Sequence, residues 1–337
     1  MGVELVRYQD RLYGAVEITE PVLRDLMLSG AMQRLRGVLQ HGISGLVGIT
    51  APVSRYEHSV GVMLLVRRLG ATLEEQIAAL LHDVSHTAFS HVIDYVFGGH
   101  NSQGYHEEVE AEYIARTDLP DVLAAHGYDW RDFLDEAAFP LLEQPAPALC
   151  ADRLDYFLRD SFDLGLATLA QCRAVLDHLV VHQGQIVTDD LQVARWCGYT
   201  YIQADDASWA NFREVALYEV TARAIRLALE QGVLTADDLW EDDETVWARL
   251  RRGGDPALRE QVLLISADTQ FVWDEDAPDF WVSTKLRTID PDVLLGGKAQ
   301  PLSALDPDFA RFRADYLRRK GGRWPVRVIA PGRDGAS

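Results

Sequence analysis

Histidines gather in one short part of the chain. Six of the ten histidines lie between residues 58 and 106, and the middle of this stretch reads LLHDVSHTAFSH, with His82 and Asp83 side by side. Imidazole and carboxylate groups together suit divalent cations such as Mn, Fe, Ni, Zn or Mg. Neighbouring side chains on a helix diverge by about a quarter turn. His82 and Asp83 therefore need ligands from other segments to complete a metal site.

Two further segments offer such ligands. His58 lies in the string SRYEHSVGV, and Asp152 lies in ADRLDYFLRD. Two imidazoles and two carboxylates would leave positions open for water and substrate, as a hydrolytic metal site requires. Asp83 can orient the attacking water, and His91 or His106 can protonate a leaving oxygen near neutral pH. The alternative is a buried ion-pair network without metal, which is costly in free energy.

Other catalytic motifs are missing from the sequence. HExxH, a complete phosphate-binding loop and a nucleophile elbow do not occur. The formal net charge of −20 excludes binding to duplex nucleic acid or to an anionic membrane surface, since both need a basic footprint. No apolar run approaches the length of a membrane span, and no apolar segment follows Met1 as in a secretory signal. Three scattered cysteines fit a reduced cytoplasm, which is the expected location.

Hydrophobic periodicity indicates the elements that must position these residues. Alternation over 3–18 predicts a β-hairpin, and residues 22–252 read mostly as helices, among them 72–84 behind a Thr72–Glu75 capping box. A long helix is expected over 205–232. Strands are expected at 261–267, 279–289 and 324–329. We thus predict three regions: a hairpin (1–20), a helical domain (21–252) and a small α+β region (253–337).

The ordered pattern H…HD…D, in the three strings quoted above, resembles the HD-domain phosphohydrolases. Within them it is most similar to the dNTP triphosphohydrolase branch, over residues 5–230. The resemblance implies a mainly α-helical HD bundle, a homo-oligomer and hydrolysis of dNTPs to deoxynucleoside and triphosphate by metal-activated water. It implies that the metal ligands are His58, His82, Asp83 and Asp152.

The resemblance also implies roles around the metal. His86, His91 and His106 would surround the α-phosphate and supply acid–base function, with Asp94 supporting one of them. The substrate-binding residues would be Gln40, Arg55, Arg153, Tyr156, Asp160 and Tyr218. Three departures bear on the sugar and the triphosphate: His41 replaces an aliphatic residue, Ala210 stands where an arginine is expected, and Val220-Thr221 replaces a His/Lys pair.

Alternatives remain open from the residues alone. A nucleotidase or phosphodiesterase acting on monophosphates, cyclic nucleotides or alarmones would use similar ligands, and an inactive nucleotide-binding regulator would need no turnover. Arg55 and Arg153 could instead pair with Glu57 and Asp155, because such ion pairs are common. Tyr218 could be a core residue, since aromatic side chains on amphipathic helices usually are.

Overall fold

An antiparallel hairpin opens the described part of the chain, which in this computed structural model covers residues 5–99, 101 and 103–330. Strand β1 (Val6–Asp10) pairs with β2 (Gly14–Ile18). The Asp10 carboxylate accepts hydrogen bonds from the backbone N–H groups of Leu12 (2.7 Å) and Tyr13 (3.0 Å), which closes the turn. The predicted hairpin is therefore confirmed, although residues 3 and 4 lie outside the described part.

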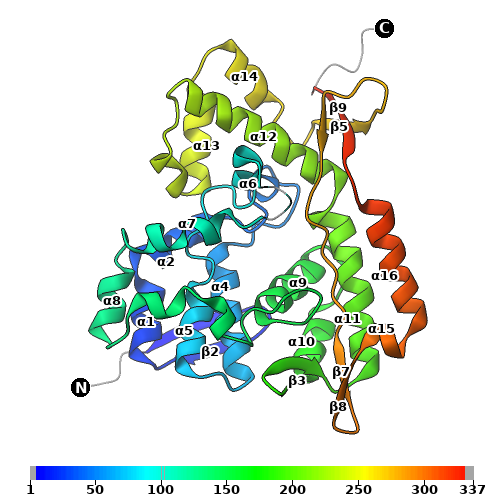
Figure 1. The fold of residues 1–337 in the computed structure, drawn as a ribbon. Helices are drawn as coiled ribbons and strands as arrows, with labels where there is room; N and C mark the ends of the chain where they lie inside the picture. Colours follow the sequence, from blue (N-terminus) through cyan, green and yellow to red (C-terminus); the bar gives the residue numbers. More distant parts are fainter. Residues whose placement is uncertain (1–4, 100, 102, 331–337) are drawn as a thin grey trace.

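Helices form most of the molecule, as predicted (Figure 1). Helix α4 (Arg55–Arg68) is buried along most of its length and packs against α5 (Leu73–Leu81) and α9 (Ala151–Asp163). Helices α4 and α9 carry the motifs of His58 and Asp152, and the string with His82 and Asp83 begins at the end of α5. The other helical segments before α9 are α1 (Pro21–Leu28), α2 (Gly30–Arg34), η1 (Leu35–Gly37), α3 (Ile43–Leu46), α6 (Val92–Phe97), α7 (Tyr105–Ile114), α8 (Leu119–Ala125), η2 (Trp130–Phe133) and η3 (Glu136–Ala138).

The predicted capping box of α5 is only half formed. The Thr72 hydroxyl accepts a hydrogen bond from the Glu75 N–H at 3.2 Å, as a helix N-cap does. The Glu75 carboxylate does not return to the cap but accepts the Leu141 N–H at 2.7 Å. A buried backbone donor from a distant loop has therefore replaced the local partner. A complete capping box does form at α4, between Ser54 and Glu57.

The prediction of one long helix over 205–232 is wrong in one respect, because the helix is interrupted at Asn211. A π-helical turn, η4 (Asp205–Trp209), precedes the break, and α12 (Phe212–Glu230) follows it. Asn211 has extended backbone angles, and its side chain accepts the Arg213 N–H at 3.0 Å, which starts a new helix. The remaining helical segments are α10 (Leu169–Asp177), α11 (Leu191–Ala204), η5 (Asp237–Trp240), α13 (Asp243–Arg252), α14 (Pro256–Leu263), α15 (Leu302–Leu305) and α16 (Pro307–Lys320).

Two small sheets complete the fold at the side of α11, α12 and α16 (Figure 1). One has the order β3-β4-β7-β8 and the other β5-β9-β6. The four-stranded sheet contains strands from both sides of residue 253. The domain boundary predicted there would therefore divide one sheet between two regions, and it stays a prediction. The strands are β3 (Leu179–His182), β4 (Gln185–Thr188), β5 (Gln270–Trp273), β6 (Phe280–Val282), β7 (Asp292–Leu295), β8 (Lys298–Pro301) and β9 (Trp324–Ile329).

The strand predictions near the C-terminus have mixed outcomes. Residues 324–329 form β9 as predicted, but only 280–282 of the segment 279–289 pair in a sheet. The strand predicted over 261–267 is wrong, because residues up to 263 belong to α14. Asp255 caps that helix through the Leu258 N–H at 3.1 Å, and Pro256 occupies its first turn. The β3–β4 hairpin lay inside a region predicted as helical.

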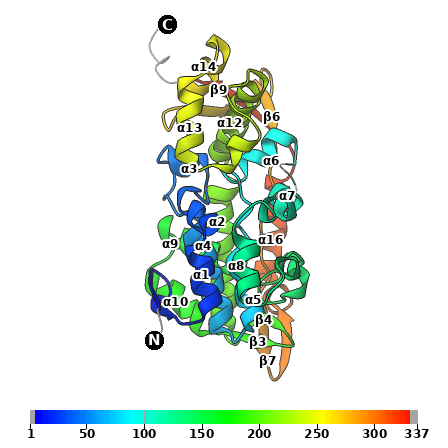
Figure 2. The ribbon, with the colours of Figure 1, turned by 90° about the vertical axis from the view of Figure 1, so that its left-hand side faces the viewer.

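Seen from the side, the molecule is narrow, with the hairpin region at one end and α13 and α14 at the other (Figure 2). A buried ion cluster fastens the hairpin to the helices that carry the motifs. The Arg159 guanidinium of α9 contacts Asp155 at 2.7 Å and Asp10 at 2.8 Å, and all three residues are buried. Gly61 of α4 lies against this cluster, and a side chain there would collide with Arg159 and Asp155. No helix among the described residues is long and apolar enough to cross a bilayer.

We expect Arg159→Ala to lower the free energy of unfolding by about 3–5 kcal/mol, because Asp10 would stay buried without its counter-charge and Asp155 would keep only His58 as an ion-pair partner among the described residues. Urea unfolding followed by circular dichroism measures this change. Arg7→Ala is the matched control, since Arg7 forms an exposed ion pair with Glu17 that contributes little. Equal stability of the two variants would contradict a structural role for the buried cluster.

Candidate metal centre and active site

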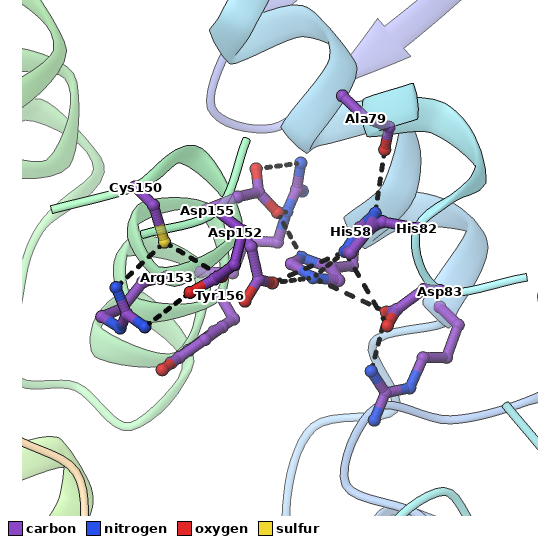
Figure 3. Close-up of polar contacts among 12 residues, drawn as sticks. His58, Ala79, His82, Asp83, Cys150, Asp152, Arg153, Asp155 and Tyr156 are labelled. Atoms are coloured by element: carbon purple, nitrogen blue, oxygen red, sulfur yellow. Dashed lines mark hydrogen bonds and ion pairs between the residues drawn. The ribbon is translucent and has the colours of Figure 1, made fainter. Parts of the chain in front are cut away.

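Three helices bring four ligand groups to one point (Figure 3). His58 lies near the N-terminal end of α4, His82 and Asp83 follow the last residue of α5, and Asp152 lies in the first turn of α9. The His58 Nε2 atom lies 2.9 Å from Asp152 Oδ1, 3.4 Å from His82 Nε2 and 3.6 Å from Asp83 Oδ2. His82 Nε2 lies 3.5 Å from Asp152 Oδ1. The structure therefore brings together all four residues that the sequence analysis predicted as metal ligands.

These separations fit a divalent cation. Ligand atoms about 2.1 Å from a cation lie about 3.0 Å apart in octahedral and about 3.4 Å apart in tetrahedral coordination. The observed distances, from 2.9 to 3.8 Å, bracket these values. His58, His82 and Asp83 are also buried, so a cation would compensate charge that water cannot reach.

Both histidine rings are turned toward this point by partners on their far nitrogen atoms. His58 Nδ1 contacts the Asp155 carboxylate at 2.9 Å, and His82 Nδ1 contacts the Ala79 carbonyl oxygen at 2.9 Å. Such partners fix the tautomer and the orientation of a metal-binding imidazole. Asp155 was absent from the predicted site, although its position one helical turn after Asp152 places it on the same face.

The cluster carries strong electrostatic coupling. Burial would raise the pKa of Asp83, but the charges of Arg55, His82 and His86 hold it well below its usual range. Burial alone would lower the pKa of His82, but Asp83 and Asp152 raise it to about 10. The same opposition of burial and carboxylates raises the pKa of His58. The carboxylates therefore favour the protonated forms of these imidazoles, and metal binding is expected to release protons.

A second histidine cluster adjoins the first. The His86 ring stacks on His106 with centroids 4.0 Å apart, and His86 Nε2 lies 3.2 Å from Asp83 Oδ1. His91 Nδ1 contacts Asp94 at 3.0 Å, so Asp94 supports this histidine, as the resemblance implied. Among the described residues, Nδ1 of His86 and of His106 is buried without a hydrogen-bond partner. The hydrogen-bonding capacity of these nitrogen atoms is therefore unsatisfied within the described residues.

The second cluster is uncharged at neutral pH. Burial, together with the positive charge that a protonated His91 would carry, lowers the pKa of His106 to about 3. Burial and the Arg55 guanidinium hold the pKa of His86 well below its usual value, and burial lowers that of His91 despite Asp94. The pKa values of the imidazoles are thus raised at the predicted metal ligands and lowered in the neighbouring cluster.

All six residues predicted to bind substrate line one cavity of about 300 Å³, together with both histidine clusters. Arg55 pairs with Asp83 at 2.7 Å rather than with Glu57, and it also donates to the Ser90 hydroxyl. Arg153 pairs with Glu143 at 3.0 Å rather than with Asp155. Both alternative ion pairs considered from the sequence are therefore wrong.

The other end of the cavity is held by a network of side chains. Asp160 accepts hydrogen bonds from His41 Nε2 at 3.0 Å and from Trp209 Nε1 at 2.7 Å. The Tyr218 hydroxyl donates to the His41 carbonyl oxygen at 3.0 Å. Tyr218 thus lines the cavity and stabilises its wall at the same time. Gln40 also lines the cavity, and its buried Oε1 has no partner among the described residues.

Several cavity residues carry no sequence motif. Gln103 comes from the loop before α7, and Lys285 and Arg287 come from the irregular segment between β6 and β7. Arg34 lies behind the site, where its Nη2 donates to the carbonyl oxygens of Val84 (2.8 Å) and His86 (2.7 Å). Only tertiary contacts identify these residues, because their local sequences show no spacing typical of ligands.

Comparisons with known proteins agree with this geometry. The HD domain family model matches residues 55–160. The chain is 40% identical to the metal-dependent phosphohydrolase cns2 of Cordyceps militaris, over 92% of this chain and 91% of that protein. It is 26% identical to a deoxynucleoside triphosphate triphosphohydrolase SAMHD1 homolog of Dictyostelium discoideum, over 52% of this chain and 40% of that protein. A phosphohydrolase structure from Bacteroides thetaiotaomicron shares the fold, with a TM-score of 0.66, 17% identity and coverage of 98% and 100%.

We expect Asp83→Ala to abolish both metal binding and turnover, because it removes one ligand and the partner of His86 and Arg55. Elemental analysis of the purified protein and a hydrolysis assay measure the two effects. Asp121→Ala, at an exposed position of α8, is the matched control. A metal-free Asp83→Ala protein with the wild-type rate would refute the assignment.

Proposed function

Because the chain belongs to the HD-domain phosphohydrolases, which are metal-dependent enzymes, we propose that it hydrolyses nucleotides, with dNTPs as the leading substrates. The products would be a deoxynucleoside and inorganic triphosphate. The observation that supports this proposal is the position of the four-ligand cluster beside three neutral histidines in one cavity. The named dNTP triphosphohydrolase relative, similar over about half of this chain, supports the substrate class.

The residues divide the chemistry among them. His58, His82, Asp83 and Asp152 would hold the cation, which, when bound, supplies Lewis-acid polarisation of a phosphoryl oxygen and makes water more acidic. Asp83 would orient the attacking water. Arg55 lies 2.7 Å from Asp83 and would offset charge on the attacked phosphate.

The leaving oxygen needs a proton, and a histidine of the second cluster (His86, His91 or His106) would supply it. The negative charge of a bound phosphate acts against burial and against Arg55, so it raises the pKa values of these imidazoles. His91 has the Asp94 carboxylate behind it, which stabilises its protonated form. We therefore assign proton delivery to His91 or His106. Tyr156, Asp160 and Tyr218 would face the sugar.

A second candidate is a nucleotidase or phosphodiesterase acting on monophosphates or cyclic nucleotides. It is favoured by the state of Arg153, whose guanidinium is bound to Glu143 and to the carbonyl oxygens of Gln144 and Ala148. Ala210 offers no charge. A triphosphate would therefore need other cations.

The deciding experiment is mass-spectrometric identification of products from a mixed nucleotide pool, with metal content measured on the same sample. Inorganic triphosphate together with deoxynucleoside supports the leading reaction. Orthophosphate from monophosphates, or opening of cyclic nucleotides, supports the second candidate. No hydrolysis with Mn, Co, Ni, Mg or Fe would refute both and favour a regulator.

We expect His91→Asn and His106→Asn to lower kcat by about 10²- to 10⁴-fold for the histidine that delivers the proton. Metal content should stay at the wild-type level, since neither residue is assigned as a ligand. His178→Asn is the control, because His178 is a partly exposed residue outside the cavity that pairs with Asp189. Wild-type kcat in both active-site variants would contradict proton delivery by these residues.

The homo-oligomer stays a prediction. Two tryptophans of the three-stranded sheet, Trp273 and Trp281, are exposed, and exposed aromatic side chains are compatible with a subunit contact. Light scattering of the purified protein at several concentrations tests it, and a monomer at all of them would contradict it.

A further inference from the structure

The cavity beside the candidate metal centre contains more carboxylates than cations. Its acidic lining residues are Asp83, Glu107, Glu136, Glu143, Asp152, Asp160 and Glu214, and its lysine and arginine residues are Arg55, Arg153, Lys285 and Arg287. Arg55 and Arg153 already bind Asp83 and Glu143. Within the described ranges, neither Lys285 nor Arg287 forms an ion pair with a carboxylate. Lys285 and Arg287 are therefore uncommitted, by which we mean that they form no ion pair with a carboxylate of the described residues.

The segment that carries both cations, residues 283–289 between β6 and β7, is held firmly against the cavity. The Arg287 N–H donates to Asp205 Oδ2 at 2.9 Å, and the Tyr316 hydroxyl donates to the same oxygen at 2.8 Å. Thr288 accepts a hydrogen bond from Arg313 Nε at 3.0 Å. These contacts fix the backbone while leaving most of the Arg287 guanidinium free, since its side chain donates to the neutral Gln103 amide and the Lys285 carbonyl oxygen.

The surroundings of Arg287 overlap only in part with those of Arg55, since the charges of both act on His91 and Tyr218. The charge of Arg55 acts on Asp83 and His86, next to the metal ligands. The charge of Arg287 acts on the hydroxyls of Tyr156, Tyr201 and Tyr218. Lys285 is close enough to Glu107 for their charges to interact, but the two residues form no ion pair. Arg55 therefore contacts a predicted metal ligand directly, whereas the side-chain hydrogen bonds of Arg287 within the described residues go to Gln103 and to the Lys285 carbonyl oxygen.

Arg287 is partly buried. A guanidinium partly withdrawn from water without an anionic partner is unfavourable, and an anion that enters the cavity lowers this cost. We propose that Arg287 and Lys285 bind the substrate's phosphate groups beyond the one attacked at the metal centre. This inference rests on the proposed function for the orientation of the nucleotide. The planar Arg287 fork suits two phosphate oxygens, and Lys285, which is more exposed than Arg287, adds a point charge. They supply the cations that Arg153 and Ala210 do not.

The test is titration calorimetry of the metal-loaded protein with inorganic tripolyphosphate and with orthophosphate. Arg287→Gln should weaken tripolyphosphate binding by about 10- to 100-fold, the loss typical of a charged hydrogen-bonding group, and Lys285→Met by less. Orthophosphate binding should change less than threefold. Lys298→Met is the control, because it removes an exposed positive charge from β8 outside the cavity. Thermal unfolding verifies that each variant is folded.

Kinetics with dNTP and dNMP supply a second measurement. In Arg287→Gln the KM for dNTP should rise about 10-fold or more, with a much smaller change for dNMP. Equal effects on tripolyphosphate and orthophosphate, or unchanged tripolyphosphate affinity, would overturn the inference. Tripolyphosphate binding that depends on Arg287, in a protein that hydrolyses no nucleotide, would support the inference and refute the proposed function.

Discussion

The meeting of His58 with Asp152 and His82 is the contact on which the site depends. These side chains come from α4, α9 and the end of α5, and their ligand atoms lie within 3.5 Å of one another. Imidazole and carboxylate groups stay so close when buried only if protons or a cation balance their charge. The packing of the three helices therefore holds these ligand atoms together at a place where a proton or a cation must balance their charge.

The residues that hold His58 in position extend from the cavity to the N-terminal hairpin. Asp155 orients His58, Arg159 binds Asp155, and Asp10 of the hairpin binds Arg159. Each buried residue in this series is the ionic or hydrogen-bonding partner of the next. The N-terminal hairpin therefore contributes to the position of His58, a predicted metal ligand on α4. This chain gives a physical reason for a hairpin beside an otherwise helical domain.

Charge is divided within the cavity. The carboxylates near the metal ligands favour cationic imidazoles at His58 and His82, while burial and Arg55 keep His86 and His106 neutral. An acidic protein with a net charge of −20 can still receive an anionic substrate if the cation and a few uncommitted basic groups lie inside the cavity. Arg287 and Lys285 fit that requirement.

The sequence by itself determined the helical class, the N-terminal hairpin and the set of metal-binding candidates, because helical periodicity and the His-Asp motifs are local patterns. It could not determine the break at Asn211 or the β3–β4 hairpin, where local capping and turn geometry override the average periodicity. Nor could it determine the partners of Arg55 and Arg153, because ion pairs depend on which helices pack together. Arg287 lies 135 positions after Asp152, and only the tertiary fold places both residues in one cavity.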